Sequence, residues 1–292
     1  MLLRHTAATL KLSVIEIKGL TYSYPGANKP SLQDVNLTVE KGEFAILTGP
    51  SGCGKTTLCR CFNGLIPHFY AGELKGDLKV AGLSVNERST GEMAKHVGLV
   101  FQNPENQLFA LSVEKDVAFG LENLGMPREQ MRERVNWALK MTEIEDLRDR
   151  APHELSGGQQ QRVAIASVLA MQPEIIVFDE PTSFLDPLAA QRIFEVISQL
   201  NKQLGITVIL VEHRLDLAAK YANHVLIMDE GTIVLDGSPR EIFNSERAWL
   251  LGVGIPKAVR LWRLLEEAGV NLKGTPVSSE EAVQLLKEVL WR

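Results

Sequence analysis

Short, almost wholly apolar runs recur along the chain and are typical of buried strands. They span residues 44–48, 97–101, 175–178 and 208–211. Segments with apolar residues at helical spacing lie between these runs, and the longest uninterrupted one covers residues 187–204. Buried strands that alternate with helices predict an α/β domain built on a largely parallel sheet.

Alternation of apolar and polar residues predicts further, half-buried strands. Residues 14–17 alternate as an edge strand would, and residues 32–39 give a second strand pattern that a turn closes. Residues 76–82 read as a short strand and turn. Farther along, residues 225–228 and 232–235 flank an Asp-Glu-Gly turn and predict a β-hairpin.

Residues 112–144 interrupt the alternation of strands and helices. Pro127 separates two helices there and begins the second. The apolar positions at helical spacing are Val113, Val117, Leu121, Leu124, Met131, Val135 and Leu139. We therefore expect a helical insertion in an otherwise α/β domain.

The composition shifts near Gly237, and two amphipathic stripes follow it. The first is made of Ala258, Leu261, Trp262, Leu265 and Ala268, and the second of Ala282, Leu285, Leu286 and Val289. A helical hairpin joined by a loop over 271–279 is expected. It either packs on the main body or forms a dimer contact, and the sequence leaves both open.

The apolar run at 44–48 leads into a glycine-rich turn and then a helical stretch, which is the context of a phosphate-binding loop. Glycines let backbone N–H groups approach a triphosphate, and the helix N-terminus adds partial positive charge. We expect Lys55 to reach the β- and γ-phosphates and the Thr56 hydroxyl to bind Mg²⁺. The nucleotide-binding residues expected here are Gly49, Pro50, Ser51, Gly52, Cys53, Gly54, Lys55, Thr56 and Thr57.

Polar residues follow other buried strands at the ends that should face the nucleotide. Asp179 is placed to hold Mg²⁺, and Glu180 to orient or deprotonate an attacking water. Gln102 and His213 also end strands, and parallel strands deliver their carboxyl ends to one edge of a sheet. Tyr24 either stacks on a purine ring or is a plain strand-end tyrosine.

Composition narrows the function classes. The net charge is −5, so the composition gives no indication of a basic surface that binds nucleic acid. The apolar runs have the length of strands and are too short to span a bilayer, so a membrane role requires a partner. Residues 1–13 lack the apolar segment of a signal peptide and are expected to be a disordered lead-in. Three clustered cysteines, Cys53, Cys59 and Cys61, fit a reduced cytosolic interior better than a zinc or disulfide framework.

The segment Leu155-Ser156-Gly157-Gly158-Gln159, between the phosphate loop and the Asp179-Glu180 strand, resembles the signature of the ATP-binding-cassette (ABC) ATPases. The resemblance runs from about residue 14 to 237. It implies a P-loop NTPase fold with a mixed central sheet, an antiparallel β subdomain and a helical signature subdomain over about 103–165. The expected division is a nucleotide-binding domain over 14–240 and a C-terminal helical extension over 241–292.

The resemblance also implies roles for residues that spacing alone does not assign. Tyr24 matches an aromatic residue that stacks on adenine in the family. Gln102 matches a residue that contacts Mg²⁺ and senses the transporter partner. His213 matches a switch histidine at the γ-phosphate, and Asp186 an aspartate that crosses to the opposite subunit. In the family, the signature residues Ser156, Gly157, Gly158 and Gln159 cover ATP bound by a second subunit. Catalysis is therefore assigned to Lys55, Gln102, Glu180 and His213, with ATP and Mg²⁺ as cofactors.

Within the family, residues 102–109 and 117–123 look like the ATPases of energy-coupling factor (ECF) importers, which take up vitamins or cobalt and nickel ions. This similarity implies a second ATPase subunit, identical or paralogous, a transmembrane coupling protein and a substrate-binding membrane protein, at the cytoplasmic face of the plasma membrane. One departure is Glu212 before His213, where threonine is commoner in the family. A carboxylate there, near the γ-phosphate, is expected to alter local pKa values.

Two other classes stay open. A soluble ABC ATPase acting on DNA or ribosomes would share the motifs, although the long coiled-coil insertion and second cassette of such proteins are absent from this sequence. A phosphotransferase would share the phosphate loop but has no role for residues 155–159.

Overall fold

The computed structural model describes residues 12–270 and 274–290. Residues 1–11, which hold most of the expected lead-in, lie outside the described part, and Ser13 already belongs to the first strand. Among the described residues, no helix combines the length and the apolar character needed to cross a bilayer.

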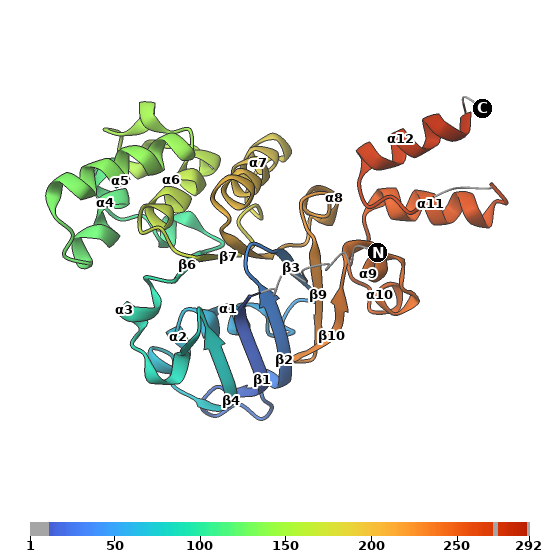
Figure 1. The fold of residues 1–292 in the computed structure, drawn as a ribbon, viewed down its shortest axis with the longest axis horizontal. Coiled ribbons are helices and arrows are strands. Elements are labelled where there is room, and N and C mark those ends of the chain that lie inside the picture. The colour runs from blue at the N-terminus through green and yellow to red at the C-terminus, as the bar shows by residue number, and fades with distance from the viewer. Residues whose placement is uncertain (1–11, 271–273, 291–292) are drawn as a thin grey trace, which may run out of the picture.

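The centre of the molecule is a six-stranded mixed sheet in the order β10-β9-β3-β8-β7-β6 (Figure 1). Its strands are β3 Phe44–Thr48, β6 Val97–Val100, β7 Ile175–Asp179, β8 Thr207–Val211, β9 His224–Asp229 and β10 Thr232–Gly237. All neighbours pair in parallel except β9 and β10, which form the expected hairpin. The prediction of a mixed α/β sheet is confirmed.

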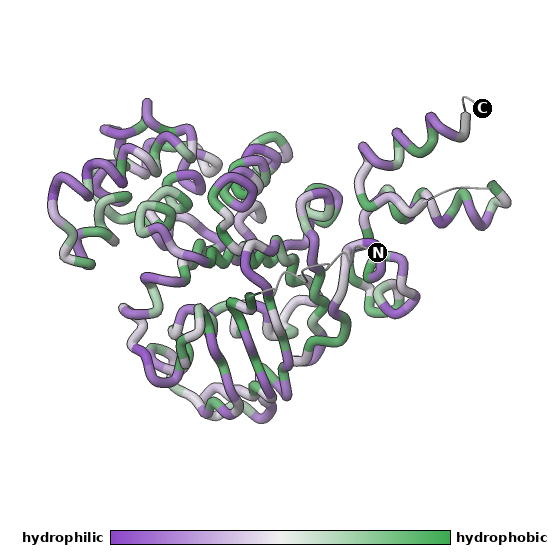
Figure 2. The backbone as a smooth tube through the Cα atoms, viewed as in Figure 1, coloured by the Kyte–Doolittle hydropathy of each residue, from purple (hydrophilic) through white to green (hydrophobic). Residues whose placement is uncertain are grey.

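Alternate residues of the central strands face two different cores. Phe44, Ile176 and Leu210 point into a core shared with α6 Gly157–Ala170 and α7 Pro187–Leu204. Ala45 and Val177 point to the other side, into a core shared with α1 Lys55–Phe62 and a second sheet. Because the strands are buried on both faces, they read as continuous apolar runs in the sequence. Figure 2 shows this hydrophobic centre and the mixed hydropathy of the outer helices.

The second sheet is antiparallel and has the order β2-β1-β4-β5. Its strands are β1 Ser13–Ser23, β2 Leu32–Glu40, β4 Glu73–Val80 and β5 Leu83–Ser84. The expectation that residues 14–17 form an edge strand was wrong, since β1 pairs with β2 on one side and β4 on the other. Alternating burial arises here because one face packs on the core.

The helical insertion has its own apolar core, built by α4 Val113–Asn123, α5 Arg128–Met141 and α6. Pro127 is the N-cap of α5, as its position in the sequence predicts. Short helices complete the body: α2 Leu65–His68, α3 Thr90–Met93, α8 Leu215–Ala218, α9 Pro239–Asn244 and α10 Glu246–Leu250.

The C-terminal hairpin consists of α11 Lys257–Glu267 and α12 Ser279–Leu290, which project from the body beside α9 and α10 (Figure 1). Trp262 packs against α12 in a small separate core, while Val259 joins the main core. Leu261 and Ala268 are exposed, so the buried stripe of α11 is shorter and rotated from the predicted one. The side chain of Val289, expected in the second stripe, lies outside the described residues.

Candidate functional site

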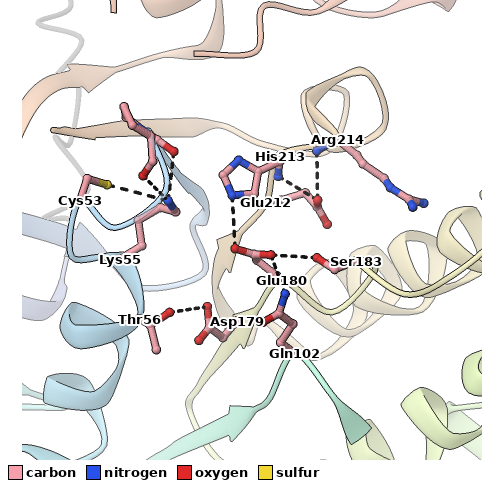
Figure 3. A network of polar contacts seen from close by, with 12 residues as sticks. Cys53, Lys55, Thr56, Gln102, Asp179, Glu180, Ser183, Glu212, His213 and Arg214 are labelled. Carbon is pink, nitrogen blue, oxygen red and sulfur yellow. Dashed lines mark hydrogen bonds and ion pairs between the residues drawn. The ribbon is translucent and has the colours of Figure 1, made fainter. Parts of the chain in front are cut away.

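The ends of neighbouring strands bring the predicted site residues to one edge of the central sheet. β3, β8, β7 and β6 run parallel, so their carboxyl ends point the same way. The loop after β3 leads into α1, which begins with Lys55 and Thr56, and Asp179 ends β7 (Figure 3). Gln102 lies just beyond β6 and His213 just beyond β8. The sheet order thus gathers residues that lie far apart in the sequence.

Two glycines of the phosphate loop sit where no side chain fits. A Cβ on Gly49 would lie 2.0 Å from the Met228 carbonyl oxygen, and one on Gly54 would lie 2.5 Å from that of Ser31. Gly54 also has a φ of 109° and is the N-cap of α1. At these two positions the loop packs against neighbouring backbone so closely that only glycine fits.

Lys55 opens α1 and is buried inside the loop. Its Nζ donates hydrogen bonds to the carbonyl oxygens of Gly49 at 3.0 Å and Pro50 at 2.9 Å, and lies 3.8 Å from Cys53 Sγ. Burial raises the pKa of the Cys53 thiol despite the nearby lysine, so this sulfur stays protonated at neutral pH. Cys53, Cys59 and Cys61 are all free and buried.

A hollow of about 210 Å³ lies on the loop. Its lining residues are Ser31, Ser51, Gly52, Gly54, Lys55, Thr56, Thr57 and Glu180. We call it the nucleotide pocket. Ser31 was not expected there, because it lies before β2 and carries no motif. Ser31 lines the pocket because its carbonyl group packs beside Gly54, a contact that only the structure shows.

Thr56, which lines the pocket, faces Asp179 at the end of β7. The Thr56 hydroxyl donates to Asp179 Oδ1 at 3.3 Å. Burial raises the pKa of the Asp179 carboxyl, and the hydrogen bond from Thr56 acts in the opposite direction. A hydroxyl and a carboxylate side by side are hard oxygen donors of the kind that Mg²⁺ binds, so these residues fit that ion.

Glu180 is the hub of a polar network (Figure 3). Its Oε2 accepts hydrogen bonds from Gln102 Nε2 at 2.9 Å and from the Ser183 hydroxyl at 2.8 Å. Its Oε1 lies 3.2 Å from His213 Nε2. The backbone of Glu180 has a φ of 49°, a left-handed conformation uncommon for a residue with a side chain. Such strain is held in place by surrounding contacts and clusters at functional sites.

Glu212 reaches this network only through its neighbours, since its hydrogen bonds go to Thr182, His213 and Arg214 and not to Glu180 itself. Its side chain is 1% exposed, and its carboxylate accepts hydrogen bonds from the Thr182 hydroxyl and from the backbone N–H groups of His213 and Arg214. It does not line the nucleotide pocket either. The expectation that it stands near the γ-phosphate finds no support, because its carboxylate turns into the protein.

The signature segment lies apart from the nucleotide pocket. Ser156 is the N-cap of α6, where its hydroxyl accepts from the Gln159 N–H and the Gln159 side chain accepts from the Ser156 N–H. Asp186 is the N-cap of α7, where its Oδ1 accepts hydrogen bonds from the Leu188 and Ala189 N–H groups. With Gly158 these residues line a second hollow of about 210 Å³, the signature hollow, which shares no lining residue with the first. Gly157 instead lines a cavity with Gln102.

Tyr24 is held at the side of α1. Its hydroxyl accepts from Arg60 at 3.2 Å and lies 3.4 Å from Thr57 Oγ1. Its ring packs edge-to-face on Tyr22, with the centroids 4.8 Å apart. Arg60, which sequence reasoning missed, also lies over the Tyr70 ring and thereby fixes the position of Tyr24.

Residues 32–183 match the ABC transporter family. The chain is 43% identical over 279 residues to a Pyrococcus abyssi protein provisionally named an ABC transporter ATP-binding protein, covering 95% of this chain and 100% of that protein. This chain belongs to the ABC transporter family. The predicted resemblance is therefore confirmed, and the protein is an ABC ATPase that binds ATP.

Three further similar proteins are known, and the first two bear on the branch of the family. This ABC ATPase is 41% identical over 276 residues to the energy-coupling factor transporter ATP-binding protein EcfA1 of Bacillus licheniformis, with 94% of this chain and 96% of that protein covered. Among solved structures, cbiO1 of Clostridium perfringens, described as part of the ABC transporter complex cbiONQ, superposes with a TM-score of 0.74 at 34% identity, covering 89% of this chain and all of that one. A dimeric ATP-binding cassette bound to ADP and phosphate, MJ0796, gives a TM-score of 0.67 at 31% identity, covering 77% and 98%.

Proposed function

We propose that this ABC ATPase is the motor subunit of an energy-coupling-factor-like importer. The observation that carries the proposal is the placement of Glu180 at the nucleotide pocket, held between Gln102 and His213. Similarity to EcfA1 and to cbiO1 supports the importer branch. The cargo would be a vitamin or cobalt or nickel ions, selected by a membrane partner.

Residues that line the pocket or contact its lining divide the chemistry of hydrolysis among them. Glu180 accepts a proton from the attacking water, whose oxygen bonds to the γ-phosphorus as the bond to the bridging oxygen of ADP breaks. His213 contacts the γ-phosphate and orients Glu180, while Lys55 holds the β- and γ-phosphates. Thr56, Asp179 and Gln102 would hold Mg²⁺, which neutralises phosphate charge when bound.

A complete site requires a second subunit. The signature hollow presents the N-termini of α6 and α7 to solvent, and no residue of it lines this chain's own nucleotide pocket. We infer that it closes over ATP held by a second ATPase, either another copy or a paralogue. ATP bound between the subunits then stabilises the closed dimer, and its hydrolysis lets the dimer open. The α11–α12 hairpin supplies a further contact between the subunits.

The membrane complex is tested by co-purification. The tagged ATPase, expressed in its native host, is purified from detergent-solubilised membranes, and its partners are identified by mass spectrometry. We expect an integral coupling protein and a substrate-binding membrane protein, which would place the ATPase at the cytoplasmic face of the membrane. A cytosolic protein without membrane partners would instead favour a soluble ABC ATPase.

A further inference from the structure

Glu212 is the most buried carboxylate among the residues that the structure describes, at 1% exposure. It follows β8 directly and precedes His213. Burying a carboxylate is costly unless hydrogen bonds satisfy it. The groups that donate hydrogen bonds to the Glu212 oxygens therefore account for its buried position.

Those groups belong to two different segments. Oε2 accepts from the buried Thr182 hydroxyl at 2.6 Å, and Thr182 lies two residues after Glu180. Oε1 accepts from the backbone N–H groups of His213 at 2.8 Å and Arg214 at 3.0 Å. One carboxylate thus fastens the backbone that carries His213 to the segment that follows Glu180.

A second link joins the same segments. The Arg214 guanidinium donates to the Leu185 carbonyl oxygen at 3.0 Å. Leu185 immediately precedes Asp186, which caps α7 and lines the signature hollow. The connection therefore runs from His213, which contacts Glu180 of the nucleotide pocket, to Asp186 at the signature hollow, through residues 182–185.

We propose that Glu212 is a positioning residue, which sets His213 against Glu180 and couples both to the 182–186 segment. The proposal rests on the roles proposed above for Glu180 and His213. A threonine at this position has one side-chain oxygen, whereas the carboxylate has two and engages both segments at once. Catalysis by Glu212 itself does not fit, because both of its oxygens are engaged away from the pocket.

The first test compares Glu212→Gln with Thr182→Val, which breaks the same link from the other side without changing charge. In steady-state hydrolysis of MgATP we expect both to lower kcat by about tenfold to a hundredfold, because small displacements of catalytic groups are expensive. The KM and the ATP dissociation constant should stay within about twofold of the wild-type values. Glu195→Gln, at an exposed position of α7, is the matched control and should keep wild-type activity.

The second test places Glu212→Gln in a His213→Ala background and measures single-turnover hydrolysis. Because Glu212 acts through His213, the double variant should lose no more than about twofold beyond His213→Ala alone. A wild-type kcat in both single variants, or a fully additive loss in the double variant, would overturn the proposal. Normal hydrolysis by Glu180→Gln and His213→Ala would instead overturn the proposed roles of those residues, a separate result.

Discussion

The nucleotide pocket and the signature hollow have the same volume, about 210 Å³, but contrasting chemistry. The pocket brings Lys55 and Glu180 together on strand ends and a glycine loop. The hollow presents the capped N-termini of α6 and α7, and in it Ser156 and Asp186 mainly hold backbone N–H groups. We propose that the pocket breaks the phosphate bond and that the hollow recognises the charge of the phosphates. On this proposal each region is half of a site, and the protein works in pairs.

The largest effect is expected from Glu180→Gln. It keeps the shape of the side chain but removes the group that accepts the proton, so kcat should fall by about a hundredfold or more. ATP binding should persist, and sedimentation should show a stable ATP-bound dimer. Near-normal turnover would show that Glu180 is not the proton acceptor, and the proposed difference in chemistry between the two regions would then be wrong.

Ser156→Arg tests the other region. A long cationic side chain at the tip of α6 should block closure over the partner's ATP and lower hydrolysis by about a hundredfold. Binding of ATP to the monomer, measured by calorimetry, should not change, because Ser156 does not line this chain's own pocket. Weaker binding in the monomer would place Ser156 in its own site. Arg132→Ala, in the helical insertion away from the signature hollow, serves as the control.

Arg60→Met sharpens the description of the pocket. Arg60 fixes the Tyr24 hydroxyl, so its loss should free the Tyr24 ring and weaken ATP binding by about threefold to tenfold. Tyr24→Ala should weaken binding at least as much. If neither change alters the dissociation constant, Tyr24 is a plain strand-end tyrosine, the alternative that the sequence left open.

The smallest effect concerns His224, remote from both regions. Its ring lies 2.9 Å from Glu43 and 2.6 Å from Asp236. Burial alone would lower the pKa of His224, but the hydrogen bonds to Asp236 and Glu43 raise it above its usual 6.5. The folded state thus holds this proton more tightly than the unfolded state, so the stabilisation is full below pH 6.5 and disappears as the pH rises through the folded-state value.

His224→Gln should accordingly lower the free energy of unfolding by about 1–2 kcal/mol at pH 6 and by less at pH 9. Urea unfolding at the two pH values measures this, and kcat at pH 7.5 should not change. An equal loss at both pH values would show that the ring stabilises the fold as a neutral group. A changed kcat would show that His224 and its two carboxylate partners are coupled to the nucleotide pocket.

Local patterns were enough to predict several elements. Helix α7 runs over Pro187–Leu204 as expected, because Asp186 and Pro187 mark its start and Gly205 its end. The strand, glycine turn and helix around Lys55 were also evident from sequence. Helices α9 and α10 were not predicted, since each is short and is stabilised by packing on the main core through Phe243 and Ala248. The exposure of Leu261 was missed because the face of α11 that becomes buried depends on how the helix packs, which the sequence pattern alone does not determine.

The sequence by itself determined the family, the phosphate loop and the polar residues at the strand ends, because these depend on neighbours along the chain. Only the tertiary structure decided that β1 lies between β2 and β4 in the antiparallel sheet and that Ser31 and Glu180 share a pocket. It alone turned the Glu212 carboxylate toward Thr182. Which groups meet depends on sheet order and on the burial of groups from distant segments, and no local pattern encodes either.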